Sequence, residues 1–313
     1  MPPISSPRRL RRSGKARVRP PQVPDDPKAS LPLSRARDAV RAIVTGAGSS
    51  FYWALRLLPR DRREAMYAVY AFCRTVDDIA DGDAGVDRKL EALAEWRDEI
   101  RRLYAGAPRH VVARALVEPI RRFTLHESDF LALIDGLTMD ASGRMCAPLL
   151  LDLELYCRRG AGAVGMLSAS IFGVRRPEGR SLALSLGQAL QFVNFLRDFA
   201  EDADQGRLYV PRELLAKAGI DTRDPHAFLR HPNLPVVAEA MAVMAEERFR
   251  AARRVLKAVP RGPAQPAWIM LETYRYLLDR LRRRGFAPTD VNRPVRIGRR
   301  RLLGIAIAAV LRH

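Results

Sequence analysis

The sequence contains no apolar run long enough to cross a membrane. No stretch of 18 or more apolar residues occurs in the chain, whereas a membrane-spanning helix needs about 20 of them. The N-terminus is basic, but it lacks the apolar core of a secretory signal. These two absences predict a cytoplasmic protein.

Cysteine, histidine and strand-like patterns are also scarce. The three cysteines, Cys73, Cys146 and Cys157, show no C-x-x-C spacing, so we expect reduced thiols. The five histidines are scattered and indicate no zinc site. Alternating apolar and polar residues are almost absent, and no internal repeat is evident, which excludes a solenoid.

Acidic residues are in the minority. The 54 Lys and Arg outnumber the 35 Asp and Glu, which gives a formal net charge of +19. A positive field of this size favours an anionic partner: nucleic acid, an anionic membrane or a phosphorylated substrate. We expect no nucleic acid, because the arginines are spread over many helical segments and no recognition module is present. A basic nucleic-acid-binding protein is the alternative from another functional class.

Apolar residues recur at helical spacing from about residue 39 to 284. The pattern predicts an all-α fold, with a single large helical domain over residues 38–298 that surrounds a central cavity. Residues 1–37 are rich in Pro and Arg and predict a disordered basic extension. Residues 299–313 form a basic and apolar C-terminal segment, which either packs on the domain or lies in a membrane interface. The clearest helical segments are 61–81, 87–105, 127–142, 152–173, 180–203, 235–258 and 265–284.

Two helical segments carry paired carboxylates. Asp77 and Asp81 stand one helical turn apart, as do Asp198 and Asp202, so each pair projects from one helix face. Buried carboxylates without a counter-charge are costly, and Mg²⁺ is a cation that bridges carboxylates to substrate phosphates. A solvated acidic helix face is the alternative, but two such clusters in apolar helices argue against it. The same segments also carry Tyr70, Arg74, Gln191, Asn194 and Arg197.

These segments resemble the motifs of the squalene/phytoene synthase family. The first aspartate-rich motif of that family is similar to Tyr70-Ala-x-Cys-Arg-x-x-Asp-Asp-x-x-Asp81. The second is similar to Gln191-x-x-Asn-x-x-Arg-Asp-x-x-Glu-Asp202, followed by Gly206-Arg-Leu-Tyr-Val-Pro211. Further resemblances lie at 49–59, a flap segment, at Tyr156-Cys-x-x-x-Ala-Gly-x-Val-Gly165, and at 274–286, a closing segment.

The resemblance implies an isoprenoid synthase fold in which Mg²⁺, or Mn²⁺ in its place, lies between the two motifs. The metal ligands that it implies are Asp77, Asp81, Asn194, Asp198 and Asp202. It implies diphosphate contacts from Ser50, Arg74, Asn194, Arg197 and Tyr274, and from Arg293 or Arg296 of the closing segment. Residues that it implies as shaping the substrate cavity are Phe51, Tyr70, Tyr156, Val164, Gln191 and Tyr209. Phe72, Phe192, Phe195 and Phe199 are further candidates for the walls of an apolar tunnel, and the alternative for most of these aromatic residues is that they simply belong to the core.

The flap and the 194–215 segment are most similar to the presqualene diphosphate synthases of bacterial hopanoid pathways. This similarity implies a prenyltransferase that joins two farnesyl diphosphates head to head and releases diphosphate, without NADPH. The alternatives are a complete squalene synthase that uses NADPH and a phytoene synthase that acts on geranylgeranyl diphosphate. Tyr70, Tyr156 or the departing diphosphate could take the proton that the reaction releases. The basic C-terminal segment implies a peripheral position on the inner face of an anionic membrane.

Overall fold

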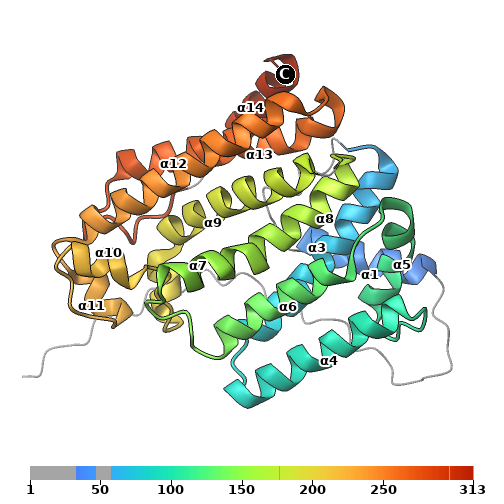
Figure 1. Ribbon diagram of the computed structural model, residues 1–313, viewed down its shortest axis with the longest axis horizontal. Coiled ribbons are helices and arrows are strands. Elements are labelled where there is room, and N and C mark those ends of the chain that lie inside the picture. Colours follow the sequence, from blue (N-terminus) through green and yellow to red (C-terminus); the bar gives the residue numbers. More distant parts are fainter. Residues whose placement is uncertain (1–32, 47–57, 176, 296, 313) are drawn as a thin grey trace, which may run out of the picture.

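The computed structural model describes residues 33–46, 58–175, 177–295 and 297–312 (Figure 1). Every regular element within these ranges is a helix, and the pairing of Cys146 with Leu208 is a single isolated β-bridge. The all-α prediction is therefore confirmed. The helices are α1 (Leu33–Gly46), α3 (Arg60–Ala80), α4 (Val86–Tyr104), α5 (Val111–Phe123), α6 (Glu127–Ala141), α7 (Leu150–Cys157), η1 (Arg158–Gly162), α8 (Ala163–Phe172), α9 (Glu178–Asp204), α10 (Arg212–Lys217), α11 (Pro225–Arg230), α12 (Leu234–Ala258), α13 (Arg261–Arg284) and α14 (Arg299–Arg312).

The long helix α9 is the centre of the packing. It lies against α8 and η1 on one side and against α12 and α13 on the other, and it also contacts α7 and α11 (Figure 1). Its sequence explains this position, because apolar residues occur around most of its circumference, as expected of a helix covered on several sides. The first aspartate motif lies on α3, which packs against α6 and α8.

The helical segment between Leu150 and Phe172 contains an irregular turn that the sequence pattern does not predict. We expected one continuous helix over 152–173, but the turn Arg158–Gly162 is a π-helix that joins α7 to α8. A Cβ atom at Gly187 of α9 would lie 2.7 Å from the carbonyl oxygen of Ala161, so glycine at 187 lets α9 approach this turn. Single π-turns inside α-helices occur frequently at functional sites.

The N-terminal end of the domain differs from the expected boundary, whereas the C-terminal segment begins where the sequence predicts. Helix α1 begins at Leu33, so residues 33–37 are helical and Ala36 is fully buried, although we had assigned them to a disordered extension. The rest of that extension lies outside the described residues. At the other end α14 packs against α13, and the Arg301 guanidinium lies 4.5 Å from the centre of the Tyr276 ring. No helix among the described residues is long and apolar enough to span a bilayer.

Candidate active site

A cavity of about 580 Å³ lies between α3, α6, α8, α9 and α13. Along α3 its lining runs from Met66 to Asp81, and along α9 from Leu182 to Asp198. Fifteen residues of α-helix span about 22 Å, so the cavity is elongated. On both helices the apolar lining residues come first and the carboxylates last. Val69, Leu133, Leu137, Phe172, Leu186, Leu190 and Met270 are among its apolar lining residues.

The two aspartate motifs meet at the acidic end of this cavity. Arg207, which follows α9, donates a 2.7 Å hydrogen bond from Nη1 to Asp81 and a 3.3 Å bond from Nη2 to the carbonyl oxygen of Ala80. The end of α3 is therefore held beside the end of α9. The sequence motif included Arg207, but we had assigned it no role.

The carboxyl groups of this end are hard to ionise together. Burial and then the neighbouring Asp81 raise the pKa of Asp77 to about 7. Burial and then Asp198 raise the pKa of Asp202 to about 8. In each case the apolar surroundings and a like charge one turn away disfavour the charged form. A bound cation would remove both penalties.

The amide and the guanidinium of the second motif also face the cavity. Asp198 accepts hydrogen bonds from Nε and Nη2 of Arg197, at 2.7 and 2.5 Å, and Tyr274 of α13 interacts with the same guanidinium. The buried oxygen Oδ1 of Asn194 has no hydrogen-bond partner in the structure. An unpartnered buried acceptor is costly, so this atom is suited to bind a cation or a donor group of a substrate.

The donor set fits Mg²⁺, provided that a substrate completes the coordination. Asp77, Asp81 and Asp198 supply hard carboxylate oxygens, and Asn194 supplies an amide oxygen with no other partner. Among the described residues, no three His, Cys, Asp or Glu side chains converge closely enough to hold a metal by themselves. This arrangement suits Mg²⁺, which is commonly bound by one or two carboxylates together with phosphate oxygens and water.

A buried carboxylate that we had not singled out lies beside this end. Asp140 of α6 lines the cavity and is only 8% exposed. It accepts hydrogen bonds from the hydroxyls of Tyr156 and Tyr209, each at 2.7 Å. The sequence gave little signal for Asp140, because it is one of four acids on α6, with Glu127, Asp129 and Asp135.

Most of the predicted site residues that the structure describes line this one cavity. They are Tyr70, Asp77, Asp81, Tyr156, Val164, Gln191, Asn194, Arg197, Asp198, Tyr209 and Tyr274. Asp202 is half-buried next to Asp198 but does not line the cavity wall. Ser50, Phe51 and Arg296 fall outside the described residues.

Two predicted arginines lie apart from the lining. Arg74 is exposed and pairs with Asp78, its neighbour one turn on, at 2.7 Å. Arg293 is 71% exposed and pairs with Asp290 at 3.1 Å. The loop that contains Arg293 is tied back to the end of α13, because Arg284 donates to the carbonyl oxygens of Val291 and Arg293. The structure therefore does not bring Arg293 to the diphosphate end, which rules against the first of the two alternatives, Arg293 or Arg296, for the closing segment.

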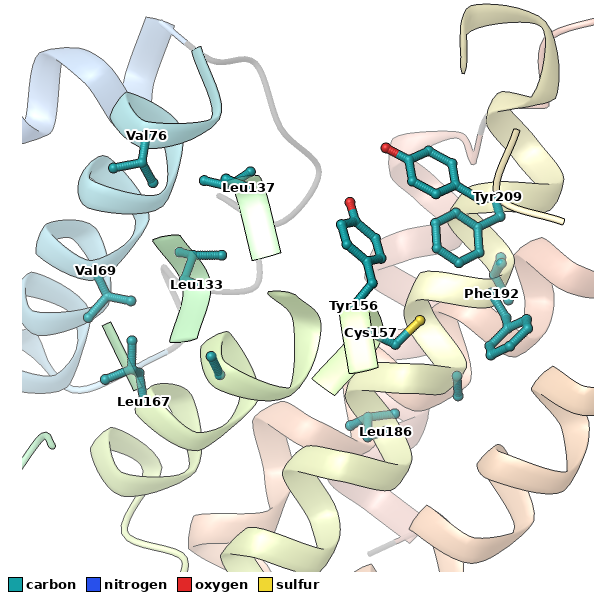
Figure 2. Close-up of a cluster of buried hydrophobic side chains, with 14 of the residues drawn as sticks. Val69, Val76, Leu133, Leu137, Tyr156, Cys157, Leu167, Leu186, Phe192 and Tyr209 are labelled. Carbon is teal, nitrogen blue, oxygen red and sulfur yellow. The ribbon is translucent and has the colours of Figure 1, made fainter. Parts of the chain in front are cut away.

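The aromatic residues that were candidates for the tunnel walls belong to the surrounding core, as the alternative for them predicts. Phe72, Phe192, Phe195 and Phe199 are all buried, and none lines the cavity. On α9 the cavity takes one helix face, and the phenylalanines lie on the others. Phe192 packs under Arg248 of α12, and Phe199 contacts Phe228 of α11 (Figure 2 shows Phe192 in the core).

Residues 44–301 match the family model described as squalene/phytoene synthase. The chain is 44% identical over 260 residues to a presqualene diphosphate synthase of Rhodopseudomonas palustris, an alignment that covers 83% of this chain and 92% of that protein. It is 30% identical to a 15-cis-phytoene synthase of Synechococcus elongatus, over 85% of this chain and 93% of the relative. A crystal structure of a dehydrosqualene synthase in complex with a ligand superposes with a TM-score of 0.77 at 25% identity, covering 88% of this chain and 96% of the other.

Proposed function

Since the chain belongs to the squalene/phytoene synthase family, we propose that it joins two farnesyl diphosphates head to head into presqualene diphosphate and releases diphosphate. The higher identity to the presqualene diphosphate synthase than to the phytoene synthase supports this product. The reaction needs no reductant, because the first coupling product is a cyclopropane that keeps one diphosphate. NADPH is therefore not a cofactor of the proposed reaction.

The observation that carries the proposal is the meeting of the two aspartate motifs at one end of an elongated apolar cavity. The diphosphate groups would lie at the end formed by Asp77, Asp81 and Asp198, and the hydrocarbon chains would extend between α3, α8 and α9 toward Met66 and Leu182. Mg²⁺ would be held there by Asp77, Asp81, Asp198, Asp202 and the Asn194 amide. When bound, it supplies positive charge that stabilises the leaving diphosphate.

The protein's own residues supply the rest of the chemistry. The guanidiniums of Arg197 and Arg207 lie at the acidic end and are placed to stabilise a departing diphosphate electrostatically. The allylic cation that remains must meet the double bond of the second substrate before it meets water. Apolar side chains along the cavity keep water away from the cation while it reacts with the double bond. Attack of the double bond, followed by loss of a proton, closes the cyclopropane.

The product is largely hydrocarbon, so its release into a bilayer is physically favourable. We propose that the protein is cytoplasmic and binds peripherally to an anionic membrane surface through α14. Leu303 and Ile307 stand one turn apart on α14 and are 61% and 51% exposed. The first turns of the same helix carry three arginines, Arg299, Arg300 and Arg301, and the attraction of each to an anionic surface is worth about 1 kcal/mol.

Mass spectrometry of the product tests the proposed reaction. The purified protein with Mg²⁺, farnesyl diphosphate and excess NADPH should form presqualene diphosphate as its final product. Squalene as the main product would establish the complete NADPH-dependent reaction instead. Rejection of farnesyl diphosphate together with turnover of geranylgeranyl diphosphate would establish phytoene synthesis.

A further inference from the structure

The environment of Asp140 is unusual for a structural carboxylate. The side chain is almost fully buried at the edge of the substrate cavity, and it accepts hydrogen bonds from two tyrosine hydroxyls. The bonds come from different elements, since Tyr156 lies at the end of α7 and Tyr209 follows α9 (Figure 2). A carboxylate that only joined helices would not need to lie on the cavity wall.

Stacked rings hold the two tyrosines in place. The rings of Tyr156, Tyr209 and Phe195 stack on one another in one cluster, with centroid distances of 4.6 Å for Tyr209 and Phe195, 5.3 Å for Tyr156 and Tyr209, and 6.2 Å for Tyr156 and Phe195. Both tyrosines line the cavity. Tyr156 sits immediately before the π-turn, whose residues Gly160 and Ala161 line the cavity. Tyr156 is therefore the better placed of the two to reach a substrate.

The direction of the hydrogen bond decides what Tyr156 can do. A phenol has one proton and two lone pairs. Because the proton of Tyr156 is donated to Oδ2 of Asp140, the phenol oxygen is left as an acceptor toward the cavity. A phenol by itself is a poor base. If the Tyr156 hydroxyl gives its own proton to Asp140 while it accepts a proton from the substrate, no phenolate forms at any stage.

The surroundings of Asp140 favour the receipt of a proton. Burial raises the pKa of its carboxyl group above the ordinary value, opposed by the positive charge of Arg207 and by the two tyrosine hydrogen bonds. The negative charge of Asp81 raises the same pKa further, and Asp77 and Asp202 are also close enough to interact electrostatically with Asp140. The carboxyl group thus binds a proton more readily than one in water, and the positive charge of Arg207 opposes this effect.

We propose that Asp140 is the final acceptor of the proton lost when the cyclopropane closes, and that it receives this proton through the hydroxyl of Tyr156. This assignment rests on the proposed function and deepens it. A C–H bond next to the cationic centre breaks, and its electron pair forms the last C–C bond of the ring. The proton adds to the Tyr156 oxygen as the phenol's own proton moves to Oδ2 of Asp140. The carboxyl group then loses the proton to water after the products leave.

The Asp140→Asn variant tests the relay in the full-length enzyme. Asparagine keeps the size of the side chain and one acceptor oxygen, but it cannot take up the proton. We expect presqualene diphosphate formation to fall by roughly 100-fold or more, the range of a lost acid–base group, with KM changed only slightly. Ionisation does not use the relay, so diphosphate release should exceed product formation as water traps the cation. Deuterium at the carbon that loses the proton should now slow turnover.

Tyr156→Phe breaks the relay at its other end and should show the same excess of diphosphate release over product formation. This second variant still tests the relay if Asp140→Asn does not fold. Tyr209→Phe removes one bond to Asp140 and should retain far more activity. Tyr104→Phe, which loses a 2.8 Å bond to the carbonyl oxygen of Leu125, is a control for the loss of a tyrosine hydroxyl elsewhere. The relay is wrong if diphosphate release and presqualene diphosphate formation fall by the same factor in these variants without an isotope effect. It is also wrong if neither rate falls. A wild-type protein that makes no presqualene diphosphate overturns the proposed function as well.

Discussion

Asp81 accepts a hydrogen bond from Arg207 although the two residues are 126 positions apart in the chain. The bond joins the last residue of the first aspartate motif to the segment that follows the second. Arg207 is 15% exposed at its side chain, whereas Asp81 is 47% exposed. The protein thus places a fixed cation between its carboxylates, at the point where it would also hold the diphosphate of a substrate.

The substitution Arg207→Met should weaken both the fold and the chemistry. Loss of the guanidinium leaves Asp81 and the Ala80 carbonyl oxygen without this donor, which we expect to lower the free energy of unfolding by about 1 kcal/mol. Turnover should fall at least tenfold. Urea unfolding and steady-state kinetics measure the two effects. Arg88→Met is the control, because Arg88 pairs with Glu91 on an exposed surface; equal effects of the two substitutions would contradict this role of Arg207.

Two neighbouring aspartates of α3 offer a matched pair of variants. Asp77 lines the cavity, whereas Asp78 is exposed and pairs with Arg74. Asp77→Asn should lower turnover by roughly a thousandfold or more and leave the helical fold intact and no less stable, because its carboxylate serves a metal rather than the core. Asp198→Asn should behave in the same way. Asp78→Asn should stay within a few-fold of wild type, and a near-native rate for Asp77→Asn would rule out the metal clamp.

The stability of the metal-free protein should fall as the pH rises. The pKa of Asp77 lies at about 7 and that of Asp202 at about 8 in the fold, against an ordinary value of 3.8. Both groups therefore hold protons in the folded state that they lose in the unfolded state between pH 4 and 8. Since the folded state binds more protons in this window, the free energy of unfolding decreases across it.

Chemical denaturation in a chelating buffer at several pH values measures this slope. Asp77→Asn together with Asp202→Asn should flatten it, because neither amide titrates. Mg²⁺ with diphosphate should also reduce the loss at high pH, since ligand binding requires the ionised carboxylates. A metal-free protein that gains stability from pH 5 to 8 would show that these carboxyl groups are not raised.

Helix α14 should promote binding to anionic vesicles. Deletion of residues 299–313 should reduce cosedimentation with vesicles that contain anionic lipid, and added salt should weaken binding of the intact chain. The double variant Leu303→Ser with Ile307→Ser is the finer test, since both side chains are exposed and their loss leaves α13 covered. Unchanged cosedimentation of the deletion variant would end the membrane proposal.

The sequence by itself determined the helical class, because the 3.6-residue period depends only on neighbours along the chain. The same local geometry placed Asp77 beside Asp81 and Asp198 beside Asp202, and it gave Gln191 and Asn194 the same face of α9. A one-turn spacing forces side chains together wherever the helix lies. The family resemblance then indicated the order of the motifs and the reaction.

Only the tertiary structure decided which face of each helix meets the cavity. The packing of α9 against α12 and α11 places Phe192, Phe195 and Phe199 in the core. These side chains are nevertheless as apolar as the residues that line the cavity. The pairings of Arg207 with Asp81 and of Asp140 with Tyr156 and Tyr209 join residues from distant segments. No periodicity encodes such contacts, since they depend on how separate helices dock. The burial that raises the pKa of Asp77 has the same origin, because a helix alone leaves that carboxylate in water.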